Sequence, residues 1–209
     1  MSGTSESPVA RGRFVVFEGL DGVGKSTQAR LLADRMGALQ TREPGGTTIG
    51  AQLRRILLDK ANVELSIRAE ALLMAADRAQ HVAEVIEPTL AAGRDVVSDR
   101  YLGSSVAYQG YGRGLPVDEI ALLSRWAADG LQPDLVFLLV APLDTLWARR
   151  SGAADRLEGA GRAFWQRVAA GFGAQAAQDP RRWIVLDATG PMTDTAQMVW
   201  QHLSDHLDG

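Results

Sequence analysis

The chain has 209 residues, 46% of them hydrophobic and 22% charged, which is ordinary for one globular domain with a sizeable core. Its net charge of -3 argues against a surface for nucleic acid, and the absence of cysteine excludes disulfides and thiolate metal sites. No apolar run approaches the ~20 residues of a membrane-spanning helix, so we expect no membrane partner and a cytoplasmic location.

The first twelve residues are mostly small and polar. They lack the apolar core of a signal peptide, and they offer little surface that folding could bury. We therefore expect residues 1–12 to form a disordered tail and residues 13–209 to form a single domain.

Four apolar segments without strict alternation are candidates for strands, at residues 14–17, 96–97, 135–140 and 183–186, and residues 38–41 are a weaker candidate for the second strand. Such segments are typical of strands that are buried on both faces of a parallel sheet. Helical patterns lie between them, so the order along the chain is strand, helix, strand, helix. The sequence predicts an α/β fold with a doubly wound, five-stranded parallel sheet flanked by helices.

The loop after the first strand has the pattern Gly, four residues, Gly-Lys-Ser at residues 19–26. Glycines let the backbone N–H groups approach a phosphate, and the helix that follows directs the positive end of its dipole at the same anion. The lysine adds a charge for the β and γ phosphates, and the serine hydroxyl can bind Mg²⁺. The predicted ATP-binding residues are Gly19, Leu20, Asp21, Gly22, Val23, Gly24, Lys25, Ser26 and Thr27.

A long helix is predicted over residues 66–92, with a bend at Pro88. Its expected core stripe consists of Leu72, Leu73, Ala76, Ala79, Ala83, Ile86 and Leu90. Met74, Arg78 and His81 lie close together on roughly the opposite face, at about 100° per residue. A solvated face is the usual explanation of such a group, and a ligand-binding face is the alternative.

Asp99 and Arg100 follow the predicted strand at residues 96–97. An acidic residue at the carboxyl end of a strand beside a phosphate loop commonly holds nucleotide Mg²⁺, so the predicted metal residues are Ser26 and Asp99. Arg100 stands where ATP-driven motors have a glutamate, and it can clamp an anionic acceptor but cannot act as a base. The segment Lys60-Ala61-Asn62 does not supply a guanine-reading motif. A kinase that acts on a small molecule remains.

Several motifs occur together over residues 14–187. They are Phe17-Glu18-Gly19-Leu20-Asp21-Gly22, Thr41-Arg42-Glu43-Pro44-Gly45-Gly46-Thr47, Ala75-Ala76-Asp77-Arg78, Asp99-Arg100-Tyr101 and Asp155-Arg156-Leu157-Glu158. In this order they resemble the thymidylate kinase family, within the nucleoside monophosphate kinases. The resemblance implies a P-loop kinase domain that transfers a phosphoryl group from MgATP to dTMP, giving ADP and dTDP.

The resemblance also implies the acceptor site. Its dTMP-binding residues would be Asp21, Arg42, Pro44, Met74, Arg78, Arg100, Ser104, Ser105, Tyr108 and Gln109. Arg42 and Arg100 would hold the phosphate. The helix face bearing Arg78 would meet the thymine base, with Arg78 also near the phosphate, while Ser105 and Gln109 would contribute to reading the base. Tyr108 would fill the space that a ribose 2′-hydroxyl needs. Met74 departs from the family, which usually has a phenylalanine stacked on thymine there.

A mobile, arginine-bearing lid is expected at residues 149–161, because the phosphate loop itself contains no arginine and so resembles the bacterial subtype. The implied catalytic residues are Lys25, Arg100, Arg149, Arg150 and Arg156. The family also implies Mg²⁺ with ATP as phosphoryl donor and a homodimer.

Two alternatives stay open from the sequence. The chain could be another nucleoside or nucleotide kinase with a different acceptor, which the base contacts would decide. It could also be an ATP-binding module without turnover, and the arginines beside the acceptor argue against that alternative.

Overall fold

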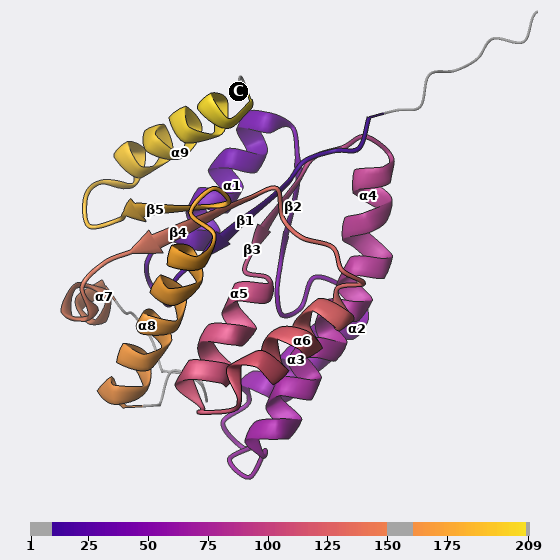
Figure 1. Ribbon diagram of the computed structural model, residues 1–209, viewed down its shortest axis with the longest axis vertical. Helices are drawn as coiled ribbons and strands as arrows, with labels where there is room; N and C mark the ends of the chain where they lie inside the picture. Colours follow the sequence, from indigo (N-terminus) through magenta and orange to yellow (C-terminus); the bar gives the residue numbers. More distant parts are fainter. Residues whose placement is uncertain (1–9, 150–160, 208–209) are drawn as a thin grey trace, which may run out of the picture.

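A computed structural model describes residues 10–149 and 161–207, and a five-stranded parallel sheet forms its centre (Figure 1). The strands are β1 (Phe14–Glu18), β2 (Leu39–Arg42), β3 (Val96–Asp99), β4 (Leu135–Val140) and β5 (Trp183–Asp187). Their order in the sheet is β2-β3-β1-β4-β5, and every neighbouring pair is parallel. The predicted doubly wound fold is confirmed.

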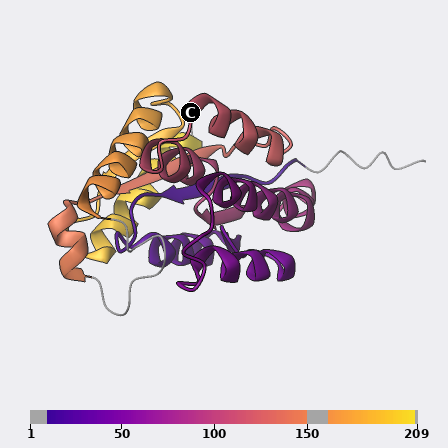
Figure 2. The same ribbon diagram turned by 90° about the horizontal axis from the view of Figure 1, so that it is seen from below.

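Helices lie on both sides of the sheet, as the view from below shows (Figure 2). They are α1 (Lys25–Met36), α2 (Thr48–Leu58), α3 (Ile67–His81), α4 (Glu87–Ala91), α5 (Leu102–Ser105), α6 (Val117–Ala127), α7 (Leu143–Arg149), α8 (Arg162–Gln178) and α9 (Met192–Leu207). Two π-helical segments, η1 (Val82–Ile86) and η2 (Val106–Gly112), continue α3 and α5. Helix α1 packs on β1, β2 and β3, and α9 packs on α1 and β5.

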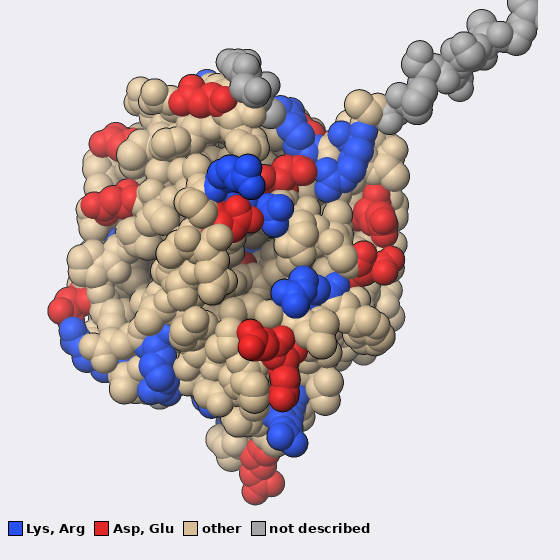
Figure 3. Space-filling model, viewed as in Figure 1, with Lys and Arg blue, Asp and Glu red and all other residues tan. Residues whose placement is uncertain are grey.

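Charged side chains of both signs are interspersed on the face of the molecule shown in Figure 3. This mixture agrees with the small net charge of the sequence. Among the helices that the structure describes, none is both long and apolar enough to cross a membrane.

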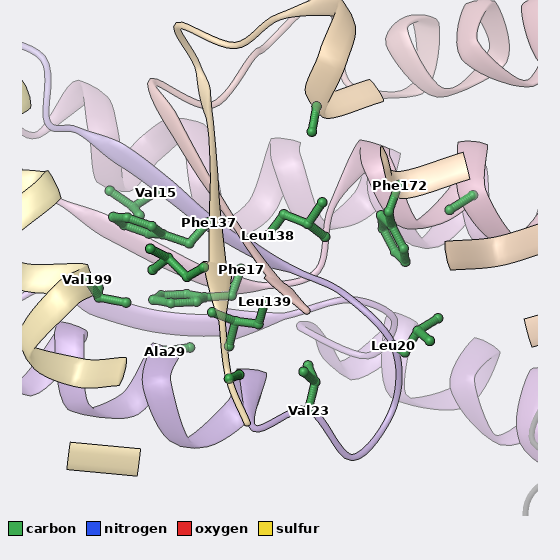
Figure 4. Close-up of a cluster of buried hydrophobic side chains, with 14 of the residues drawn as sticks. Val15, Phe17, Leu20, Val23, Ala29, Phe137, Leu138, Leu139, Phe172 and Val199 are labelled. Atoms are coloured by element: carbon green, nitrogen blue, oxygen red, sulfur yellow. The ribbon is translucent and has the colours of Figure 1, made fainter. Parts of the chain in front are cut away.

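The central strand β1 is buried along its whole length and anchors the core on both faces. Val15 and Phe17 belong to the cluster that includes α1 and α9, where the rings of Phe17 and Phe137 stack with centroids 5.4 Å apart (Figure 4). Phe14 and Val16 belong to the cluster with Ile86 on the other face. Each buried side chain of this size contributes about 1.5 to 3 kcal/mol, so the end of β1 is a rigid support for the loop that follows.

The order of the strands also places the site. From β1 the chain crosses to β2 on one side of the sheet, whereas β4 and β5 lie on the other side. In such sheets the ligand crevice forms outside the carboxyl ends of the strands, at the point where the order reverses. The loops after β1 and β3 meet at this edge.

The prediction for residues 66–92 is wrong in its first half. The single helix is divided into α3, η1 and α4, and Leu72 is 59% exposed instead of buried, while Ile86 and Leu90 are buried as expected. Of the remaining stripe residues, Ala76 and Ala83 are exposed. The inner face of α3 carries polar residues that hydrogen bond in the site, so an apolar pattern cannot identify it. The π-helical segment η1 lies in the turns directly before Pro88. Proline lacks an N–H and its ring clashes with the preceding turn, so a regular α-helix cannot continue through this point.

The disordered tail predicted for residues 1–12 is too long at its carboxyl end. Gly12 is buried and its N–H donates to the carbonyl of Leu90 at 2.9 Å, and Arg11 forms an ion pair with Asp134 at 3.0 Å. Residues 1–9 lie outside the described part of the chain, as do residues 150–160 of the predicted lid.

Candidate active site

The loop between β1 and α1 has the geometry of an anion cradle. Helix α1 begins at Lys25 with no side-chain cap and no acidic residue in its first turn, so its free N–H groups and positive dipole end are unopposed. Gly19 has a φ of 134°, and a Cβ there would lie 2.3 Å from the carbonyl oxygen of Leu139. The tight approach of the two backbones therefore requires glycine at this position.

Lys25 is a buried cation at the base of this loop. Its Nζ donates to the carbonyl of Leu20 at 2.8 Å and lies 3.9 Å from Asp21 Oδ1. Burial and the nearby charge of Arg100 lower the pKa of Lys25 to about 8. An anionic phosphate beside Nζ would favour its charged form.

Ser26 and Asp99 form an oxygen-rich pair next to the loop. Ser26 Oγ donates to Asp99 Oδ2, while Asp99 Oδ1 is buried and has no hydrogen-bond partner among the described residues. Carboxylate and hydroxyl oxygens are the ligands that Mg²⁺ prefers, and Mg²⁺ usually takes its remaining ligands from water and phosphate. In the described part of the chain there is no larger metal-binding group of His, Cys, Asp and Glu. The two predicted metal residues thus fit a magnesium ion.

Arg100 links the loop after β1 to the segment after β3. Its Nη1 donates to the Gly19 carbonyl at 3.1 Å and to Ser104 Oγ at 2.8 Å, and its Nη2 donates to Asp21 Oδ1 at 2.5 Å and to the Tyr108 hydroxyl at 3.1 Å. Its φ of 74° is in the left-handed region, which is uncommon for a residue other than glycine. The guanidinium is therefore fixed in place before any substrate arrives.

Asp21 is the anionic partner in this network. It accepts from the Tyr108 hydroxyl at 3.0 Å as well as from Arg100. Burial alone would raise the pKa of Asp21, but the charges of Arg100 and Lys25 outweigh it and hold that pKa well below the usual range. Asp21 is consequently a carboxylate at every physiological pH.

A cavity opens beside Arg100, between the phosphate loop, α3 and η2. Nine of the ten residues predicted for the acceptor line it, namely Asp21, Pro44, Met74, Arg78, Arg100, Ser104, Ser105, Tyr108 and Gln109. The tenth, Arg42, is exposed and lines a neighbouring cavity with Ser26 and Asp99. Arg42 thus borders the metal pair rather than the acceptor cavity.

Arg78 is buried, so the solvated-face interpretation of its helix is wrong. Only 2% of it is exposed, and it forms an ion pair with Glu43 Oε2 at 2.8 Å. It also donates to Ser105 Oγ at 3.1 Å and to the Tyr101 carbonyl at 3.0 Å. Its Nε has no hydrogen-bond partner among the described residues.

His81 and Asp77 support the loop after β2. His81 Nδ1 lies 3.0 Å from Glu43 Oε1, and His81 Nε2 lies 2.6 Å from Thr41 Oγ1. Asp77 Oδ1 accepts from the Gly45 N–H at 2.9 Å. Burial and the nearby Glu43 raise the pKa of Asp77 to about 6.

Sequence reasoning missed several supporting residues of the site. Glu18 is buried at the end of β1 and accepts from the N–H groups of Tyr101 and Ser104. Glu43 and Asp77 were visible only as members of motifs. Charged residues inside or beside apolar segments are the signal that could have identified them, because an unpaired charge is rarely buried.

The predicted lid arginines are described only in part. Arg149 donates to the carbonyls of Ala188 and Thr189 at 2.9 and 2.7 Å. Arg150 and Arg156 lie outside the described residues. A contact between any of the three and a transferring phosphoryl group stays a prediction.

Comparison with known proteins identifies the family. A family model described as thymidylate kinase matches residues 17–199, most of the chain. The chain belongs to the thymidylate kinase family. A thymidylate kinase of Cupriavidus metallidurans is 48% identical over 185 residues, covering 86% of this chain and 91% of that protein. A thymidylate kinase of Synechococcus sp. (strain RCC307) is 49% identical, covering 92% of this chain and 95% of that protein.

The fold agrees with a solved structure of the same thymidylate kinase family. The crystal structure of thymidylate kinase from Ehrlichia chaffeensis superposes with a TM-score of 0.76 at 30% identity, covering 93% of this chain and 99% of that one. The prediction of a kinase is confirmed, and the alternative of a nucleotide-binding module without turnover is not favoured.

The raised pKa of Asp77 predicts a pH-dependent effect of the substitution Asp77→Asn. A folded-state pKa of about 6, above the ordinary 3.8, means that between pH ~4 and ~6 the folded state binds more protons than the unfolded state. Stability is therefore lost as the pH rises through this window. Asparagine keeps the acceptor for Gly45 and cannot ionise.

At each pH we compare the melting temperature of Asp77→Asn with that of the unsubstituted protein. We expect this difference, variant minus unsubstituted protein, to be more positive at pH 7.5 than at pH 4.5. Asp34→Asn on α1, an exposed aspartate, serves as the control and should show no such difference. If Asp77→Asn changes the melting temperature by the same amount at both pH values, the pKa of Asp77 is not raised in the folded protein.

Proposed function

We propose that the chain transfers the γ-phosphoryl group of ATP to the 5′-phosphate of dTMP, giving ADP and dTDP. The observation that carries this proposal is the position of Arg100. Its guanidinium joins the phosphate loop to the wall of the adjacent cavity, and the resemblance to the thymidylate kinases implies that this cavity binds the acceptor. A cytoplasmic location is part of the proposal, because the reaction draws on the cell's ATP.

The chemistry requires position and charge more than proton transfer. A nucleotide 5′-phosphate is already anionic near pH 7, so the attacking oxygen needs no general base. Lys25 would neutralise charge on the β and γ phosphates, and Arg100 would align the acceptor phosphate in line with them. Arg42, in the cavity that Ser26 and Asp99 also line, would add positive charge near the transferred phosphoryl group.

Mg²⁺ fits the oxygen pair of Ser26 and Asp99, and the buried Asp99 Oδ1, which has no hydrogen-bond partner in the described part of the chain, supports this assignment. When bound, the ion would neutralise charge on the β and γ phosphates. One of the arginines Arg149, Arg150 and Arg156 would complete the neutralisation from the lid.

The remaining acceptor roles follow the positions of the side chains around the cavity. Met74 and Arg78 lie on the α3 side, where the base would sit, and Ser105 and Gln109 would read its edge. Tyr108 is held against Asp21, and its ring packs edge to face on Phe164 and Trp165. A ring fixed in this way would leave little room for a ribose 2′-hydroxyl.

We also propose a homodimer. Helix α3 packs between α2 and α6, and the three helices expose large apolar side chains. These are Ile49 and Ile56 on α2, Ile67 and Leu72 on α3, and Leu122 and Trp126 on α6. Trp126 is 78% exposed, which is unusual for so large an apolar side chain unless a partner covers it. A second copy of the chain is the occupant that the family resemblance implies.

The function is tested by coupled ADP release with thymidine, uridine, cytidine, adenosine and guanosine monophosphates in ribo and deoxy forms, and with thymidine. We expect dTMP to have the highest kcat/KM. Lys25→Ala should lower kcat by on the order of 10² or more, because the charge acts mainly in the transition state. Near-normal turnover by a folded Lys25→Ala protein, or a different preferred acceptor, would overturn the proposal.

The dimer is tested by light scattering after size-exclusion chromatography. We expect a mass of twice the 22.4 kDa of one chain. Trp126→Glu should shift it towards the monomer, because a charge in an apolar interface is costly. Val185→Glu, at a 53% exposed apolar residue on β5, is the matched control and should leave the mass unchanged. A monomeric mass for the unsubstituted protein would refute the dimer.

A further inference from the structure

A buried amide in the acceptor cavity has its orientation determined by a carboxylate. Gln109 lies in η2, is only 1% exposed and lines the cavity. Its Nε2 donates to Glu70 Oε1 at 3.0 Å. Glu70 is fully buried on α3, one turn before Met74.

Glu70 is itself held in one orientation. Arg113 donates from Nε to Glu70 Oε1 at 3.2 Å and from Nη2 to Glu70 Oε2 at 3.1 Å. The Arg113 guanidinium also lies over the ring of Phe164, 5.0 Å from its centroid. A forked pair of this kind fixes the plane of the carboxylate.

A carboxylate paired in this way can only accept hydrogen bonds. If the Gln109 amide were turned by 180°, its carbonyl oxygen would face Glu70 and the two acceptors would repel each other. One amide orientation is therefore strongly favoured. In that orientation Nε2 keeps a second hydrogen, and Oε1, on the other arm of the amide, does not face Glu70.

We propose that Glu70 is a positioning residue that selects acceptors whose base has an imide edge, by holding the Gln109 carbonyl towards the base. This inference rests on the proposed function. The imide of thymine or uracil offers an N3–H donor beside a carbonyl acceptor, which matches the Gln109 carbonyl and the second Nε2 hydrogen. Cytosine offers the reverse, an N3 acceptor beside an amino donor. With cytosine, two acceptors, the Gln109 carbonyl and N3 of the base, would face each other in a buried site, and this repulsion would strongly disfavour cytosine.

The test is the substitution Glu70→Gln. A glutamine at position 70 can donate to the Gln109 carbonyl, so both amide orientations become available. We expect the ratio of kcat/KM for dTMP over dCMP to fall by about tenfold or more. The ratio for dTMP over dUMP should stay within about twofold, because thymine and uracil share the imide edge. The KM for ATP should not change. Where dCMP turnover is too slow, its inhibition constant replaces kcat/KM.

Glu84→Gln is the matched control, because Glu84 also accepts from a glutamine amide, that of Gln80, but on an exposed surface. It should leave both acceptor ratios unchanged. Glu70→Gln leaves the Arg113 guanidinium without its carboxylate partner. If the protein folds poorly for that reason, the double variant Glu70→Gln with Arg113→Met removes the guanidinium as well, and it should also lower the ratio of kcat/KM for dTMP over dCMP.

An unchanged ratio of dTMP to dCMP in a folded Glu70 variant would overturn the inference, as would an equal loss with all three acceptors. Either result leaves the proposed function standing, provided that the unsubstituted protein phosphorylates dTMP. Failure of the unsubstituted protein to do so would overturn both.

Discussion

The ion pair between Arg100 and Asp21 is the interaction on which the site depends. Through it the guanidinium ties the loop after β1 to the segment after β3, with further bonds to Gly19 and Ser104. A buried charge is costly without a partner, and Asp21 offsets that cost. Arg100 has a left-handed backbone, and the surrounding bonds hold it there. An anionic acceptor would therefore meet a cation whose position is already set, which is the condition for electrostatic catalysis.

A second layer of buried charge holds this arrangement against α3. The inner face of α3 carries Glu70, Asp77, Arg78 and His81, all buried. Each has a partner outside α3, so this one helix holds the loop after β2, η2 and the segment after β3. Such a face is less favourable for stability than an apolar one, and the raised pKa of Asp77 is a sign of that cost. It provides fixed directions for polar groups, which an apolar core cannot provide.

The strands and the phosphate loop could be predicted because their signals are local. Apolar segments define four of the strands, and the spacing of glycines and Lys25 defines the loop. Strand β2, with the sequence LQTR, has only a weak signal of its own. The acceptor residues came from the family resemblance. The buried face of α3 could not be predicted from periodicity. A periodicity search assigns the apolar face of a helix to the core, and the buried face of α3 is largely polar. The left-handed Arg100 and the pairing of Gln109 with Glu70, 39 residues apart, depend on tertiary contacts that no local pattern contains.

The central claim is that Arg100 is fixed in advance as the clamp of an anionic acceptor, and the kcat of Arg100→Lys with dTMP tests it most directly. Lysine keeps the positive charge, but its three N–H donors cannot replace the four hydrogen bonds that the forked guanidinium makes to Gly19, Ser104, Asp21 and Tyr108. The account predicts a fall in kcat on the order of 10² or more, with the KM for ATP little changed. A folded Arg100→Lys protein with near-normal kcat would show that charge alone suffices, and it would contradict the account.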